Sequence, residues 1–280
     1  MNIRNLRVIV LGLTLVLSMG IFSGCAKEAA PVQTSEEGSL EGEVAVVGST
    51  SVTPLAQEIA DAFMLKNPGV RVDVQGVGST AGVKAASEGA ADIGMASRDL
   101  KTEEKGWGLD EHIIAYDGIA VVVHPTNEVG DLDPETVKAI FKGEITNWKE
   151  VGGADEEILI VSREEGSGTR GAFEELLEID AVKEDALIAE GNGSVKANIA
   201  SKTYGIGYIS LSYVDETVKT VEINGVEPTV DNILAGSYKV SRPFLMLTKG
   251  ENSGIAKAYL DFIFSEEGQA IVSEKNIPVK

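Results

Sequence analysis

Cysteine and histidine are nearly absent from this 280-residue chain, which holds one cysteine, Cys25, and two histidines, His112 and His124. So few residues of these types cannot build a His/Cys metal cluster. The segment Gly166-Ser167-Gly168 follows Glu165, so it does not match the Gly-x-Ser-x-Gly pattern of serine hydrolases. The sequence therefore predicts a protein that is not an enzyme and that uses neither a metal nor another cofactor.

Positive charge is also scarce, because 24 Lys and Arg residues stand against 44 Asp and Glu residues, for a net charge of -20. This excess argues against nucleic acid and against an anionic membrane surface as direct partners. Aromatic residues make up only 5% of the chain, whereas glycine is plentiful at 31 residues. Abundant glycine suits a protein of sheets and helices that are joined by many tight turns.

The apolar run over residues 8–17 is too short and too early in the chain for a membrane span, and it follows two arginines. These features predict an export signal. The run leads into Phe22-Ser23-Gly24-Cys25, which resembles a bacterial lipoprotein signal and implies cleavage before Cys25 and lipid attachment to it. Removal of residues 1–24 with their two arginines would change the net charge from -20 to -22. The alternative is an ordinary secretory signal with an incidental cysteine.

Residues 25–41 are small or polar and show no hydrophobic period, so they predict a flexible tether. Signal and tether together predict a protein that is held at the cell membrane by lipid and works on the extracytoplasmic side. Beyond residue 41, predicted strands alternate with predicted helices, which favours an α/β fold with mainly parallel pairing. We find no internal repeat of 20–50 residues.

The folded part is organised around a turn at residues 163–170, between a strand predicted over residues 158–161 and a helix predicted from residue 171. The two glycines of this turn let the backbone approach a ligand closely, and its serine, threonine and arginine add donors. Backbone N–H groups and the positive end of the helix dipole also favour an anion there. A capped helix behind a flexible loop is the alternative reading of this turn taken alone.

Two further turns of the same kind decide between these interpretations. Ser49-Thr50-Ser51 and Ser79-Thr80 each follow a predicted strand and precede a predicted helix, and Arg98 and Arg163 follow other strand-like segments. Ligands of open α/β sheets bind at the carboxyl ends of the strands, where such turns converge. The sequence therefore predicts a donor-rich site for a compact tetrahedral oxyanion.

Over residues 43–280 the chain resembles the phosphate-binding component of bacterial high-affinity ABC phosphate importers. The stretches that carry this resemblance are Gly48-Ser49-Thr50-Ser51, Gln75-Gly76-Val77-Gly78-Ser79 with Gly82-Val83-Lys84, Gly94-Met95-Ala96-Ser97-Arg98, Ile140-Phe141-Lys142-Gly143 with Ile145-Thr146-Asn147-Trp148, and Arg163-Glu164-Glu165-Gly166-Ser167-Gly168-Thr169. The resemblance implies a two-lobed periplasmic-binding-protein-like fold of type II, in which each lobe is a mainly parallel sheet flanked by helices.

The resemblance further implies lobe 1 at residues 42–117 and 244–280, lobe 2 at residues 118–243, and crossovers near residues 115–120 and 240–246. It implies a monomer that binds inorganic phosphate in the cleft between the lobes and hands it to membrane permease subunits. The phosphate-binding residues that it implies are Thr50, Ser51, Ser79, Arg163, Ser167, Gly168 and Thr169. The hydroxyl turns and strand ends add Ser49 and Arg98, and Asp117 is our own candidate.

One position departs from the family pattern. Well-known members carry an aspartate where this chain has Arg98, and there the carboxylate accepts the proton of hydrogen phosphate and so excludes sulfate. Our candidate for the missing acceptor is Asp117, which lies near a predicted crossover; the alternative is an ordinary turn residue before Gly118. Arg98 keeps sulfate, molybdate or tungstate open as ligands. A phosphate-sensing or adhesion lipoprotein without a transport role is also open.

Overall fold

The computed structural model of the chain describes residues 40–250 and 254–279. Cys25, the predicted signal and nearly all of the predicted tether lie outside the described residues, so these remain predictions. None of the helices within the described ranges combines the length and the apolar character that crossing a bilayer requires.

Strands and helices alternate along much of the chain, as the sequence predicts. The strands are β1 (Gly42–Gly48), β2 (Val70–Gly76), β3 (Ile93–Ala96), β4 (Leu109–Val123), β5 (Asp131–Leu132), β6 (Leu159–Arg163), β7 (Leu187–Ala189), β8 (Gly205–Ser210), β9 (Lys219–Thr220), β10 (Glu222–Ile223), β11 (Ser241–Lys249) and β12 (Ile277–Pro278). The α-helices are α1 (Thr53–Lys66), α2 (Ser79–Glu88), α3 (Pro134–Lys142), α4 (Gly168–Leu176), α5 (Gly191–Ser201), α6 (Val230–Leu234), α7 (Gly254–Ile263) and α8 (Glu266–Val272). Short 3₁₀ helices are η1 (Glu104–Trp107), η2 (Trp148–Val151) and η3 (Leu211–Tyr213).

Local sequence signals explain where the helices begin and end. In α3 the Asp133 carboxylate accepts a hydrogen bond of 2.9 Å from Thr136 N, Pro134 occupies the first helical position, and Gly143 ends the helix in the left-handed conformation. These three residues predict α3 from the sequence. In α1 the apolar positions recur at helical spacing and are buried, and the helix ends at Lys66, with Asn67 as its C-cap before Pro68.

The sheets combine parallel and antiparallel pairs. The main path runs β2-β1-β3-β11-β4-β8-β6-β7, with β12 and β9 added beside β4, and β10 pairs with β5 separately. Among these strands every antiparallel pair includes β4 or β11, and every other pair is parallel. The expected parallel pairing therefore holds away from these two strands. β4 and β11 lie side by side in opposite directions, because one leaves the first group of elements and the other returns to it.

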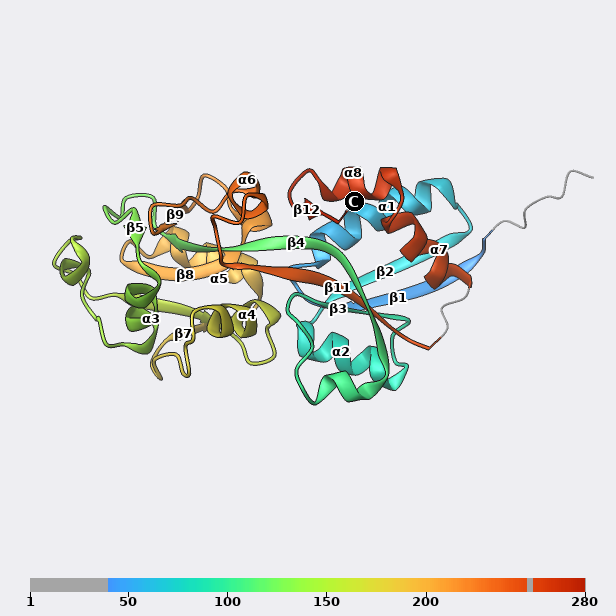
Figure 1. The fold of residues 1–280 in the computed structure, drawn as a ribbon, viewed down its shortest axis with the longest axis horizontal. Helices are drawn as coiled ribbons and strands as arrows, with labels where there is room; N and C mark the ends of the chain where they lie inside the picture. Colours follow the sequence, from blue (N-terminus) through green and yellow to red (C-terminus); the bar gives the residue numbers. More distant parts are fainter. Residues whose placement is uncertain (1–39, 251–253, 280) are drawn as a thin grey trace, which may run out of the picture. The chain divides into compact units, whose positions relative to one another are not determined.

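Figure 1 shows β4 and β11 running between two groups of elements, which we refer to as lobe 1 and lobe 2. Lobe 1 contains α1, α2, α7 and α8 around β1–β3, and its core joins residues from both ends of the described chain, such as Phe63 and Tyr259. Lobe 2 contains α3 to α6 around β6–β8, and its core includes Phe173 stacked on Tyr208 with ring centroids 4.0 Å apart. The precise lobe boundaries, after residues 117 and 243, remain predictions; both positions fall within β4 and β11.

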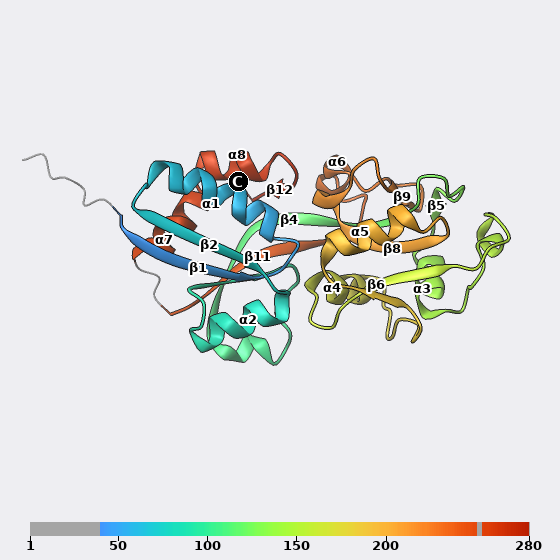
Figure 2. The ribbon, with the colours of Figure 1, turned by 180° about the vertical axis from the view of Figure 1, so that it is seen from behind.

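The carboxyl ends of the parallel strands point to the junction of the lobes. In lobe 1, β1 leads into α1 and β2 leads into α2; in lobe 2, β6 leads into α4 and β7 leads into α5. Figure 2 shows α4 on the side of lobe 2 that is nearest to lobe 1. The fold therefore brings four helix N-termini toward one region.

Glycine permits the close packing that holds α2 in this position. A Cβ added at Gly82 would lie 2.5 Å from Gly48 Cα, 2.6 Å from Val47 O and 2.7 Å from Met95 O. All three contacts are with backbone atoms, which cannot turn aside as a side chain can. Gly82 therefore sets how closely α2 approaches β1 and β3.

We expect Gly82→Ala to lower the free energy of unfolding by roughly 1–3 kcal/mol, because the helix must move away from the sheet. Urea denaturation followed by circular dichroism measures this change. Gly193→Ala is the matched control, since a Cβ at this position in α5 would meet no atom within 4 Å. The control should raise the free energy of unfolding by about 0.5–1 kcal/mol, because alanine favours a helix more than the glycine that it replaces. Equal effects at the two positions would contradict this account of Gly82.

Candidate functional site

Most of the buried polar side chains of the described residues gather at the junction of the lobes. Burying such groups is unfavourable unless they find partners, so a dense group of them indicates a functional site rather than a packing requirement. We refer to this group as the polar cluster; its buried members are Ser49, Ser51, Ser79, Ser97, Asp117, Arg163, Ser167, Thr169, Asn192, Ser210, Arg242 and Asn276.

Lobe 1 contributes hydroxyl groups from three loops. Ser49 Oγ accepts hydrogen bonds from Ser51 N at 3.2 Å and Val52 N at 3.4 Å, so it orders the turn before α1, and it donates to Ser97 Oγ at 2.8 Å. Ser79, the first residue of α2, accepts a hydrogen bond from Ser97 N at 3.1 Å. Three loops that follow β1, β2 and β3 are thereby joined through serine hydroxyls.

Lobe 2 places the start of α4 directly against these hydroxyls. Thr169 Oγ1 lies 2.7 Å from Ser51 Oγ, and a Cβ added at Gly168 would lie 2.1 Å from Ser79 Oγ. Ser167 caps α4 by accepting a hydrogen bond from Arg170 N at 3.2 Å. The glycine at position 168 is therefore what lets the two lobes approach so closely.

A fourth helix start, that of α5, completes the arrangement. Asn192 Nδ2 donates to Ser51 Oγ at 2.9 Å, and Asn192 Oδ1 accepts from Ser210 N at 3.0 Å. The positive dipole ends of α1, α2, α4 and α5 thus meet around Ser51. Each such terminus favours negative charge, with an effect equivalent to about half an elementary charge.

Arg163 ends β6 and points into the cluster from lobe 2. Its Nε and Nη2 donate to both oxygens of Glu164 at 2.8 and 2.7 Å, and Nη2 also donates to Thr50 Oγ1 of lobe 1 at 3.1 Å. Burial by itself would raise the pKa of Glu164, but the hydrogen bonds and charge of Arg163 hold this pKa below its usual value. Arg163 is therefore paired with a carboxylate that stays ionised at neutral pH.

A second arginine, Arg242, occupies the cluster from β11. It stands opposite Asp117 of β4 in the strand register, and its Nη2 donates to Asp117 Oδ2 at 3.0 Å and to Ser51 Oγ at 3.2 Å. Asp117 Oδ1 accepts from Ser210 Oγ at 2.9 Å and from Asn276 Nδ2 at 3.3 Å. Complete burial raises the pKa of Asp117, while the charge and hydrogen bond of Arg242 act in the opposite direction.

Both arginines have a buried nitrogen that lacks a hydrogen-bond partner. Within the described residues, Arg163 Nη1 and Arg242 Nε are the buried side-chain nitrogen or oxygen atoms in this condition. An unsatisfied buried donor costs about 1–3 kcal/mol, and more when it is charged. Two of them in one cluster indicate a site for a ligand that is rich in acceptors. A tetrahedral oxyanion has such acceptors on every side.

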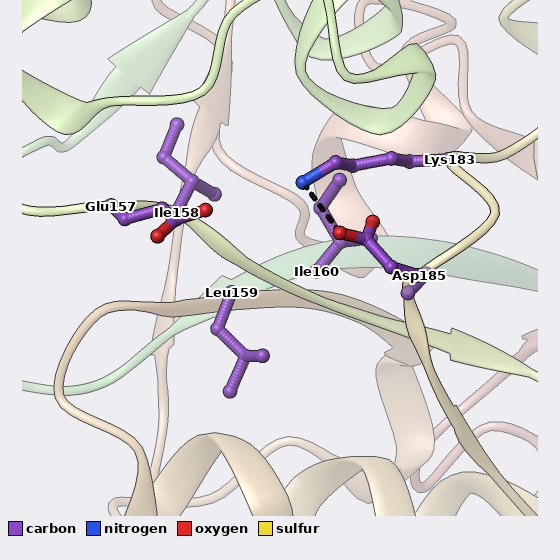
Figure 3. A pocket seen from close by; sticks show the side chains of 7 residues that line it. Glu157, Ile158, Leu159, Ile160, Lys183 and Asp185 are labelled. Carbon is purple, nitrogen blue, oxygen red and sulfur yellow. Dashed lines mark ion pairs between the residues drawn. The ribbon is translucent and has the colours of Figure 1, made fainter.

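The pocket at the start of β6 lacks this donor set. Figure 3 shows a pocket of about 220 Å³ along the first residues of β6, which is lined by Glu157, Ile158, Leu159, Ile160, Lys183, Asp185 and Ala186. Its one cation, Lys183, lies 3.1 Å from Asp185. Apolar side chains and a paired charge suit no oxyanion, so the polar cluster remains the candidate site.

Comparison with known proteins identifies the family. Residues 32–267 match the PBP superfamily domain. The phosphate-binding protein PstS of Bacillus subtilis (strain 168) is 36% identical over 265 residues, which cover 92% of this chain and 87% of that protein. The chain belongs to the PstS family of phosphate-binding proteins.

Solved structures agree with this family and confirm the predicted two-lobed fold. A putative phosphate ABC transporter substrate-binding protein with bound phosphate from Clostridium perfringens is 50% identical, with a TM-score of 0.84 over 85% of this chain and 100% of that chain. An ABC-type phosphate transport receptor from Vibrio cholerae is 38% identical, with a TM-score of 0.73 over the same shares.

The fold brings most of the predicted site residues into or beside the polar cluster. These residues are Ser49, Thr50, Ser51, Ser79, Asp117, Arg163, Ser167, Gly168 and Thr169. Their role in binding phosphate stays a prediction. For Asp117 the contacts suggest a different role from the expected one, since both of its oxygens already accept hydrogen bonds and one of them comes from Arg242.

Arg98 is the predicted site residue that the structure does not bring into the cluster. Its Nη1 and Nη2 donate to the two oxygens of Glu104 at 2.7 and 2.8 Å, and they also donate to Asp99 O and Thr80 Oγ1. Its side chain lines a cavity of about 300 Å³ between α2 and α4, and Ser167 of the polar cluster lines the same cavity. The neighbouring Ser97 supplies the cluster instead, because the Arg98 side chain turns toward the buried Glu104 of η1.

Five buried members of the polar cluster are absent from the predicted site residues, namely Ser97, Asn192, Ser210, Arg242 and Asn276. Asn192 and Arg242 show what the sequence could and could not reveal. Asn192 stands in Gly191-Asn192-Gly193 at the start of α5, soon after β7, and a polar residue between glycines at such a strand-to-helix transition is a signal that could have revealed it. Arg242 directly precedes Pro243 at the start of an apolar strand. Its distance of 125 residues from Asp117 hides the pairing from any local pattern.

We expect Gly168→Ala to weaken oxyanion binding by roughly tenfold or more, because the added methyl group would hold α4 away from Ser79 and Ser97. Isothermal titration calorimetry measures the dissociation constant. Gly171→Ala in the same helix is the control, since its Cβ would make only an ordinary contact of 3.4 Å with Arg98 Cδ. Equal affinity of the two variants would contradict the proposed contact.

The Arg98–Glu104 pair predicts a specific dependence of stability on pH. Burial would raise the pKa of Glu104, but Arg98 holds it below the unfolded value of 4.5. A lowered folded-state pKa means that the stabilisation is present above about pH 4.5 and is lost as the pH falls through the folded-state pKa. Glu104→Gln should therefore flatten the decline of the free energy of unfolding below about pH 4.5, as measured by urea denaturation at several pH values. The exposed neighbour supplies the control Glu103→Gln, which should keep the parent slope; a parent-like slope in Glu104→Gln would refute the assignment.

Proposed function

We propose that this protein captures inorganic phosphate between its lobes on the extracytoplasmic side and delivers it to the permease of an ABC importer. The observation that carries the proposal is the pair of unpartnered, buried nitrogens, Arg163 Nη1 and Arg242 Nε, among the hydroxyls of the polar cluster. Relatives that are named phosphate-binding proteins support the same ligand.

Binding requires the lobes to part and close again. Ser51 Oγ and Thr169 Oγ1, which lie 2.7 Å apart across the junction, must separate to admit an oxyanion. On closure both hydroxyls donate to the ligand instead of sharing one hydrogen bond with each other. The two arginine nitrogens and the helix N-termini supply the remaining donors, so binding energy is gained only when both lobes engage.

The remaining parts of the proposal concern the location of the protein in the cell, its oligomeric state and its lack of catalysis. A lipid on Cys25 holds the protein at the outer face of the cell membrane, and the protein acts as a monomer. It performs no catalysis: in the described part of the chain, the two carboxylates beside the cluster, Asp117 and Glu164, are both committed to arginines. A general base requires a carboxylate or imidazole that is free to take a proton.

Because Asp117 and Glu164 are both paired with arginines, the site also favours a second candidate function, the binding of sulfate or a related tetrahedral oxyanion. Phosphate carries a proton that needs an acceptor, and sulfate does not. Hydroxyl groups such as those of Ser79 and Thr169 can accept as well as donate, which is how the cluster would accommodate hydrogen phosphate without a free carboxylate. Only the ligand preference separates the two candidates.

Calorimetry with phosphate, sulfate and molybdate tests the function. The protein is first unfolded and refolded in phosphate-free buffer to remove bound anions. We expect phosphate to bind more tightly than sulfate, and we expect Arg163→Ala to weaken phosphate binding by roughly 10- to 100-fold, since a charge-assisted hydrogen bond is worth about 1.5–3 kcal/mol. Arg71→Ala, at an exposed arginine, is the control and should bind as the parent does. Equal or tighter binding of sulfate would overturn the assignment to phosphate.

A further inference from the structure

We propose that Arg242 is a second cationic ligand of the bound oxyanion and that Asp117 positions it. This inference rests on the proposed function and adds a recognition element to it. Arg242 and Asp117 lie on β11 and β4, the two strands that join the lobes, so the connection between the lobes itself takes part in ligand recognition.

The contacts of Arg242 fix the plane of its guanidinium group. Nη1 donates to Ser97 O at 3.1 Å, and Nη2 donates to Asp117 Oδ2 and Ser51 Oγ. A planar group that is held at both terminal nitrogens has a fixed direction for its third donor, Nε–H. This nitrogen is buried and lacks a partner within the described residues, so one donor of a fixed fork is left for a ligand.

Ser51 Oγ marks where the ligand would lie. It accepts from Arg242 Nη2 at 3.2 Å and from Asn192 Nδ2 at 2.9 Å, and it lies 2.7 Å from Thr169 Oγ1. An oxyanion that separates Ser51 from Thr169 therefore arrives next to the Arg242 guanidinium. Arg163 reaches the same turn through Thr50 Oγ1.

The two arginines also act on each other. Burial lowers the pKa of Arg242, Asp117 opposes this effect, and the positive charge of Arg163 lowers the pKa further. Arg163 and Arg242 are paired with Glu164 and Asp117, but a like charge nearby in a buried site is still unfavourable, and an anion that contacts both guanidinium groups offsets this repulsion. This electrostatic relation supports a ligand that both guanidinium groups contact.

Asp117 is held as a support rather than as a group that faces the ligand. Oδ2 binds Arg242, and Oδ1 accepts from Ser210 at the end of β8 and from Asn276 before β12. The carboxylate is thus anchored by both lobes behind the guanidinium. Its removal would free Arg242 to turn, and it would leave a buried cation without a partner.

A double-mutant cycle tests the assignment by calorimetry with phosphate and with sulfate. The proteins are the parent, Arg242→Gln, Asp117→Asn and the double variant, with Arg71→Gln as the matched control at an exposed arginine. We expect Arg242→Gln to weaken phosphate binding by roughly tenfold or more, Asp117→Asn to weaken it less, and the control to match the parent. If Asp117 acts only through Arg242, Asp117→Asn should cause no further loss in the Arg242→Gln background.

A further measurement and a further variant distinguish a contact between Arg242 and the ligand from a purely structural role of Arg242. The melting temperature is measured with and without phosphate, because loss of a ligand contact reduces the phosphate-induced increase whatever happens to the ligand-free value. Arg242→Lys keeps a cation beside Asp117 but lacks Nε–H. This variant replaces Arg242→Gln in the binding test if Arg242→Gln does not fold. We expect the lysine variant to bind phosphate several-fold more weakly than the parent.

Parent-like affinity in Arg242→Gln or in Arg242→Lys would overturn the role of Arg242. An undiminished effect of Asp117→Asn in the Arg242→Gln background, together with a gain in sulfate binding, would make Asp117 a direct proton acceptor and overturn its positioning role. Failure of the parent to bind any oxyanion would instead remove the proposed function and this inference with it. The variants therefore test the inference separately from the function.

Discussion

The ion pair between Asp117 and Arg242 joins the only two strands that, within the described residues, run through both lobes. Both side chains are buried, and a buried charge is costly unless it is paired and hydrogen-bonded. The pair meets this constraint through Ser51, Ser97, Ser210 and Asn276. The arrangement of the surrounding loops therefore depends on keeping these two charges satisfied.

The same constraint governs the other buried arginines. Arg163 is paired with Glu164, and Arg98 is paired with Glu104. Because each cation has its own carboxylate, the site carries little net positive charge of its own. The attraction for an anion then comes from helix dipoles and directed donors, which act at short range, whereas the acidic surface is screened within about 10 Å at ordinary salt. This explains how a protein with a net charge of -20 can hold an anion.

Local patterns in the sequence were sufficient to predict much of the fold and part of the candidate site. The strand–turn–helix units at Ser49-Thr50-Ser51, Ser79-Thr80 and Ser167-Gly168-Thr169 were predicted, because glycine, hydroxyl residues and apolar periodicity each have a direct local meaning. α-Helix α3 was predicted from its aspartate cap and closing glycine for the same reason. The antiparallel pairing of β4 and β11 could not be predicted in this way, because the direction of a strand depends on the path by which the chain returns to the sheet.

The side-chain partners of the charged residues depend on packing that no local pattern records. Arg98 follows a predicted strand just as Arg163 does, yet it turns to Glu104, because that carboxylate is buried beside it. Arg242 and Asp117 meet only because β11 returns alongside β4. Local patterns in the sequence thus determined the alternation of strands and helices and the hydroxyl-rich helix starts that favour an oxyanion, and the family resemblance added the two-lobed arrangement. Only the tertiary structure decided which arginines face that site, because the direction of a guanidinium is set by the partners that the fold brings to it.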